Sequence, residues 1–171
     1  MLRSLWLSSP TLNLFAAPPG LSANDIASHE KWIQDINELS KTTVKFPIIG
    51  DKDRKVATEY DMLDALDPTN VDAKGIPFTV RTVFVIDPKK VIRLKIEYPA
   101  STGRHFQEIL RVIDSLQIGD AKRVTTPANW QKGDKVIIHP SVQGDEVQKL
   151  FGTDIETVKP YLRFTSYPGE A

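Results

Sequence analysis

The chain has 171 residues, 40% hydrophobic and 26% charged, which is ordinary for a globular protein of one domain or of one domain with a small appendage. Its 22 basic side chains balance 22 acidic ones, so no long-range field gathers nucleic acid or an anionic membrane. It has no cysteine, which excludes a disulfide, a thiolate nucleophile and a cysteine metal site. No stretch approaches the roughly 18 apolar residues that indicate a membrane span.

Residues 1–20 differ in character from the rest of the chain. They contain one arginine and no acidic residue, and the first acid in the sequence is Asp25. Two interpretations stay open for this segment. It could be an organelle transit segment, although its basic residues are few, or a non-homologous or disordered N-terminus, which is the interpretation we prefer.

Two helices and a short strand are predicted in the first part of the chain. Residues 22–40 have the helical spacing of apolar side chains, and Ser22 and Asp25 stand in the S-x-x-D arrangement of a helix start. Residues 46–49 predict a short strand. Residues 54–66 predict a second helix, which an Asp-Pro pair stops.

Residues 79–98 predict a β-hairpin followed by a helix. The first strand, 79–86, is β-branched and aromatic, and Asp-Pro-Lys-Lys forms the turn. The second strand, 91–98, alternates, so two sets of side chains are expected on opposite faces: Ile92, Leu94 and Ile96 on one face, and Arg93, Lys95 and Glu97 on the other. An apolar stripe then predicts a helix over 103–117.

The character of the sequence changes after Gly119. Residues 135–139 and 161–166 predict strands, and residues 145–151 predict a short helix between them. We therefore expect three segments: 1–20 without homology, a core over 21–119, and a small α+β C-terminal domain over 120–171.

Two arginines are the candidate site residues. Arg81 lies inside an apolar strand, where a charge is costly unless it is paired or exposed. Arg104 lies at the predicted start of a helix, where the helix dipole disfavours a cation. Each could be a surface residue, which the residues alone favour, or a cation that holds an anion.

Other candidate sites are weaker. His29, His105 and His139 are scattered without the spacing of metal ligands, so no metal site and no cofactor is expected. Ser22 lacks the closing glycine of a G-x-S-x-G motif, and we assign it to helix capping. Trp32 and Trp130 are interpreted as packing residues.

The sequence resembles peroxiredoxins, in particular the one-cysteine subfamily. The resemblance rests on IPFTVRTVFVIDPKK and YPASTGRHFQEILRVIDSLQ, extends upstream through FPIIGDKDRKVA, and extends downstream through KRVTTPANWQKGDKVIIHP and YLRFTSYP. It covers about residues 20–168. It implies an α/β fold, with a partial thioredoxin-like core and the extended C-terminal domain of that subfamily.

The resemblance also implies roles for the two arginines. In this family an arginine on the first hairpin strand lies beside the peroxidatic thiolate, and Arg81 matches it. A second arginine, in the T-G-R turn, lies near the same pocket, and Arg104 matches that one. The family's P-x-x-x-T-x-x-C segment, which supplies the cysteine, has no counterpart here, so we expect a truncated and catalytically inactive peroxiredoxin.

Two further hypotheses stay open. The chain could be a non-catalytic module that forms a homodimer, or a heterodimer with a full-length peroxiredoxin, through the edge strand 91–98 and the C-terminal domain. It could also bind an ordinary anion at Arg81 and Arg104, which we rank last. The resemblance implies an intracellular chain of the cytoplasm or the mitochondrion, with a peroxide as the substrate of its relatives.

Overall fold

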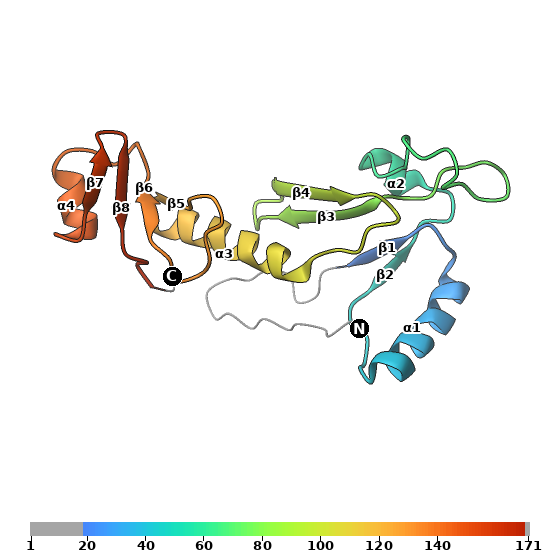
Figure 1. Ribbon diagram of the computed structural model, residues 1–171. Helices are drawn as coiled ribbons and strands as arrows, with labels where there is room; N and C mark the ends of the chain where they lie inside the picture. The colour runs from blue at the N-terminus through green and yellow to red at the C-terminus, as the bar shows by residue number, and fades with distance from the viewer. Residues whose placement is uncertain (1–18, 170–171) are drawn as a thin grey trace. The chain divides into compact units, whose positions relative to one another are not determined.

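A computed structural model describes residues 19–169, and the N-terminal segment discussed above therefore lies almost wholly outside the described residues (Figure 1). The chain forms two compact units, Met1–Arg104 and His105–Ala171. The helix that follows the hairpin therefore belongs to the second unit. The expected domain boundary near residue 120 stays a prediction.

The first unit begins with a strand that the sequence analysis did not predict. Strand β1, Gly20–Ser22, pairs in parallel with β2, Ile48–Gly50, which is the strand expected near 46–49. Helix α1, Ile26–Ser40, connects the two strands. The residues Gly-Leu-Ser of β1 contain a single apolar side chain and so show no strand pattern, and only the pairing with β2 defines this strand.

The start of α1 corrects the prediction for Ser22. Ser22 is the last residue of β1, and its hydroxyl lies 3.3 Å from the side-chain oxygen of Asn24. Asp25 is the N-cap instead, because its carboxylate accepts a hydrogen bond of 2.8 Å from the backbone N–H of Ser28. The helix begins at the first residue whose side chain can satisfy a free N–H of the first turn.

The second helix is much shorter than predicted. Helix α2 spans only Lys55–Glu59, where the sequence predicted 54–66. Asp61 adopts a left-handed backbone with φ of 51°, which ends the helix, and Leu63 then forms a β-bridge with Thr79. The apolar residues after 60 therefore pair with the chain that leads into the hairpin and do not continue the helix.

The predicted hairpin is present. Strand β3, Arg81–Ile86, pairs antiparallel with β4, Ile92–Tyr98, and the backbone N–H of Lys90 donates to the carbonyl of Asp87 across the turn. The expected alternation of β4 is wrong at one residue. The register shifts between Val85 and Ile86, so Ile92 lies opposite Ile86 and shares the face of Phe84 and Lys95.

The second unit contains the long helix and a small sheet. Helix α3, Phe106–Lys122, begins after the N-cap His105 and is longer than predicted. Four strands form a sheet in the order β5-β6-β8-β7. They are β5 (Val124–Thr125), β6 (Val136–Ile138), β7 (Glu156–Lys159) and β8 (Leu162–Thr165), and α4 (Asp145–Phe151) lies between β6 and β7 in the chain. The sequence predicted β6, α4 and β8 but not β5 or β7.

The two units differ in their cores. Both clusters of buried apolar residues lie in the second unit: one contains Ile118, Val124, Trp130 and Val136, and the other contains Ile138, Val142 and Val147. Among residues 19–104, Ala57 is the one fully buried hydrophobic residue. The packing interpretation is therefore confirmed for Trp130, whereas Trp32 is 48% exposed.

Candidate functional site

The two candidate arginines flank the β3–β4 hairpin in the first unit. Arg81 is the first residue of β3, and Arg104 lies after β4, between Gly103 and the N-cap of α3. Arg104 therefore directly precedes the N-cap, so it lies at the positive end of the helix dipole, as the sequence predicted. Both side chains are reachable from solvent.

Backbone carbonyls hold each guanidinium in place. The Nε of Arg81 donates to the carbonyl of Ala100 over 3.2 Å, so the strand holds the turn that follows β4. The guanidinium of Arg104 donates to the carbonyl of Thr82 over 3.3 Å, so that turn reaches back to the strand. Each arginine is thus oriented by a backbone carbonyl of the other segment, and neither of these hydrogen bonds involves a carboxylate.

The two positive charges affect each other. Partial burial lowers the pKa of the Arg104 guanidinium, and the nearby charge of Arg81 lowers it further, while Tyr98 acts in the opposite direction. No carboxylate among residues 19–169 forms an ion pair with either arginine. Two guanidiniums that repel each other and lack a counter-charge form a site to which an anion is attracted.

The other residues considered in the sequence do not join this site. His29 is buried on α1, His105 caps α3 through its ring nitrogen, and His139 contacts Ser141. The described residues contain no group of three or more His, Asp or Glu side chains that could hold a metal ion. None of the helices in the described part is long and apolar enough to cross a membrane.

Comparison with known proteins identifies the family. The AhpC/TSA family matches residues 16–95, and the C-terminal domain of 1-Cys peroxiredoxin matches residues 115–153. The chain is 45% identical to peroxiredoxin-6 of Sus scrofa over 157 residues, which cover 86% of this chain and 69% of that protein. The chain belongs to the peroxiredoxin family. Its similarity to 1-Cys peroxiredoxins confirms the subfamily that the sequence resembled.

A second relative and two solved structures agree with this assignment. The mitochondrial peroxiredoxin of Saccharomyces cerevisiae is 56% identical over 147 residues, covering 85% of this chain and 56% of that protein. Peroxiredoxin 6 of Arenicola marina has a TM-score of 0.81 at 41% identity, covering 89% of this chain and 70% of that structure. The yeast mitochondrial 1-Cys peroxiredoxin has a TM-score of 0.75 at 52% identity, covering 86% and 69%.

These comparisons confirm the expected fold class, a partial thioredoxin-like core with a C-terminal domain. The chain spans 56% of the length of the Saccharomyces cerevisiae relative and 69% of the porcine one. This peroxiredoxin-family sequence contains no cysteine, the residue from which thiol peroxidases take their nucleophile.

Proposed function

We propose that Arg81 and Arg104 form the anion-holding part of a thiol-peroxidase site. The observation that supports this is that partial burial and the nearby charge of Arg81 lower the pKa of Arg104, and that neither guanidinium has a carboxylate partner among the described residues. A guanidinium beside a thiol favours the thiolate, and it can donate hydrogen bonds to peroxide oxygens as charge develops on them.

The chain with this sequence does not reduce peroxide by itself, because it has no thiolate to attack the O–O bond. The test is peroxide consumption by the purified chain with dithiothreitol as reductant. We expect the rate of the buffer alone for hydrogen peroxide and for an organic hydroperoxide. Turnover that persists after contaminating peroxidases have been removed contradicts this expectation.

Anion binding is tested separately. At constant ionic strength, sulfate should raise the thermal midpoint of the first unit more than chloride does. This increase should disappear in Arg81→Gln and in Arg104→Gln. Lys159→Gln, which removes one exposed positive charge from β7, is the matched control and should keep it. An increase that all three variants retain shows that the arginines do not hold the anion.

A second candidate function is a non-catalytic module that pairs with a full-length peroxiredoxin. It is favoured by the poor core of the first unit, where Ala57 is the one fully buried hydrophobic residue among 19–104. Within residues 19–169, β4 also pairs with β3 alone, which leaves its other edge open. Co-purification with a cysteine-bearing family member should be lost in Ile96→Arg and retained in Val158→Arg. Equal recovery of both variants with the family member contradicts pairing through β4.

We also propose that the chain acts in the cytoplasm or the mitochondrion. Support comes from the yeast relative, which is named as mitochondrial. Fractionation of source cells, followed by detection of peptides from residues 105–169, distinguishes the two compartments. Recovery in a secreted fraction contradicts both.

A further inference from the structure

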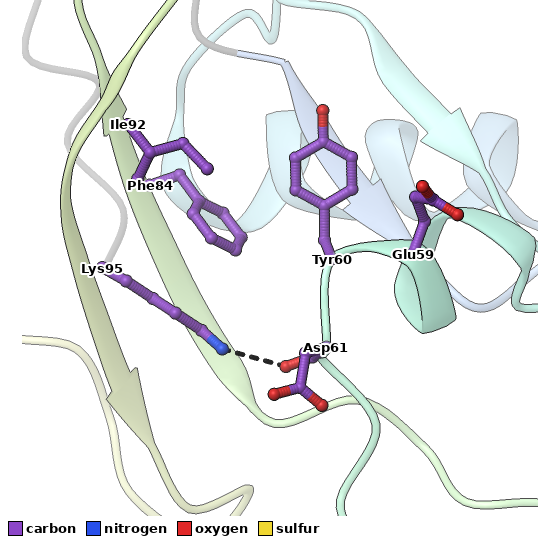
Figure 2. Close-up of a pocket in the computed structure, with 6 residues that line it drawn as sticks. All are labelled: Glu59, Tyr60, Asp61, Phe84, Ile92 and Lys95. Atoms are coloured by element: carbon purple, nitrogen blue, oxygen red, sulfur yellow. Dashed lines mark hydrogen bonds between the residues drawn. The ribbon is translucent and has the colours of Figure 1, made fainter.

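A shallow open hollow of about 500 Å³ lies between the end of α2 and the β3–β4 hairpin (Figure 2). Glu59, Tyr60 and Asp61 form one wall, and Phe84, Ile92 and Lys95 of the hairpin form the other. Side chains alternate along a strand, so Phe84 and Arg81 belong to opposite faces of β3. The hollow is therefore separate from the arginine site.

Half of the lining side chains of the hollow, Tyr60, Phe84 and Ile92, are aromatic or aliphatic. The ring of Tyr60 meets the ring of Phe84 edge to face, with centroids 5.5 Å apart and planes at 73°. Tyr60 is nevertheless 44% exposed, and Ile92 is 49% exposed. The register shift in the hairpin places Ile92 on this face, and it adds an uncovered aliphatic surface to the aromatic pair.

The positive charge in the hollow is already satisfied. The ammonium of Lys95 lies 2.7 Å from the carboxylate of Glu97, donates to the backbone carbonyl of Asp61 over 2.9 Å, and stands 5.8 Å from the centre of the Phe84 ring. Figure 2 shows its stem crossing the hollow toward Asp61. Glu97 therefore neutralises the ammonium of Lys95, and Lys95 does not attract an incoming anion.

The negative charge is in excess. Glu59 and Asp61 form no ion pair with any residue between 19 and 169. Glu97, which is not part of the lining, neutralises Lys95, so the two lining carboxylates of Glu59 and Asp61 leave a net charge of −2 beside the apolar side chains. A ligand with a carboxylate would be repelled there, and a cation would be attracted.

We propose that this hollow binds a basic side chain of a partner protein, an arginine or a lysine set among apolar residues. Its hydrocarbon stem packs on Tyr60 and Ile92, and its cationic end reaches the carboxylates of Glu59 and Asp61. The exposed tyrosine face also attracts a guanidinium. The interaction requires neither a thiol nor a peroxide, and it lies beyond the proposed peroxidase-type function.

The first experiment uses the full chain and two peptides, acetyl-Leu-Leu-Arg-Leu-Leu-amide and the same peptide with citrulline in place of arginine. Citrulline keeps the shape of arginine and removes its charge. Backbone amide shifts of Tyr60, Phe84 and Lys95 report binding. We expect saturable shifts with the arginine peptide and binding at least about tenfold weaker with citrulline.

Charge variants of the protein provide the second arm. Glu59→Gln and Asp61→Asn should each weaken arginine-peptide binding by about three- to tenfold. Asparagine tolerates the left-handed backbone of Asp61, so the fold is retained. Glu38→Gln on α1 is the matched control, and Arg81→Gln tests independence from the arginine site; neither should change the affinity.

Several outcomes overturn the proposal. Equal binding of the citrulline peptide means that the hollow accepts any apolar segment. Unchanged affinity in both Glu59→Gln and Asp61→Asn, shifts that map to other residues, or no binding at millimolar peptide also contradict it. If N-butylguanidine binds as tightly as the peptide, the ligand is a small organic cation and the partner protein is excluded.

Discussion

The indole N–H of Trp130 donates a hydrogen bond to the backbone carbonyl of Asp134 over 3.1 Å, while the side chain is only 1% exposed. Trp130 packs with Ile118, Val124 and Val136, so one side chain joins helix α3 to the small sheet of the second unit. The core of this unit therefore depends on a residue whose only polar group is satisfied locally.

We predict that Trp130→Ala lowers the free energy of unfolding of the second unit by about 3–5 kcal/mol, because it leaves a cavity in one of the two buried apolar clusters of that unit. Trp130→Phe should cost less, since the ring volume is mostly kept. Urea unfolding followed by circular dichroism measures both. Trp32→Phe, at a residue 48% exposed, is the control and should change stability by no more than about 0.5 kcal/mol.

The cap of α1 predicts a pH dependence. The hydrogen bond from the Ser28 backbone N–H lowers the pKa of Asp25 below the ordinary aspartate value of 3.8. A carboxylate whose pKa is lower in the folded state contributes stability that is present above 3.8 and is lost as the pH falls through the folded pKa. The protection factors of the α1 amides, which are exchange rates corrected for the intrinsic rate at each pH, should therefore fall as the pH drops through the folded pKa of Asp25. Asp25→Asn keeps an acceptor and should remove this dependence, whereas Asp35→Asn should retain it.

The hairpin turn offers a stabilising substitution. Lys90 has a left-handed backbone with φ of 65°, which costs a side-chain-bearing residue more than glycine. We expect Lys90→Gly to raise the stability of the hairpin by about 0.5–1 kcal/mol, measured by hydrogen exchange of β3 and β4 amides. Lys89→Gly makes the same change at a residue outside the left-handed region. There glycine only raises the conformational entropy of the unfolded chain, so we expect the hairpin to lose stability. A gain in both variants would show that backbone conformation is not the cause.

The proximity of Arg81 and Arg104 predicts how the thermal midpoint depends on anions. Because the charge of Arg81 opposes that of Arg104, Arg81→Gln should leave the thermal midpoint unchanged or raise it in low-salt buffer without oxyanions. When sulfate is added, the order should reverse, and the unsubstituted chain should become the more stable one. Arg81→Lys, which keeps the charge but not the planar fork, should show a weaker response to sulfate. A lower midpoint of Arg81→Gln without sulfate would contradict the mutual repulsion.

Much of the fold could be predicted because it is local in the sequence. Alternating β-branched residues around Asp87-Pro88 predicted the hairpin, and the apolar stripe after Gly103 predicted α3. The strands β1, β5 and β7 were missed because two to four residues carry little alternation, and each is defined by its pairing with another strand. The equally short β2, β6 and β8 could be predicted because they coincide with apolar or aromatic runs. Helix α2 was predicted too long because propensity cannot foresee the bridge between Leu63 and Thr79.

Some features of the candidate site could likewise be predicted from the sequence, and others required the structure. The family, the two arginines and the absence of a cysteine could all be read from the amino-acid sequence, because these are properties of residue identity. Tertiary structure decided that the charges of Arg81 and Arg104 act on each other, that Asp25 and not Ser22 caps α1, and that Ile92 joins Phe84 and Lys95. These depend on distances between atoms and on a one-residue register shift, which alternation along a single strand does not encode.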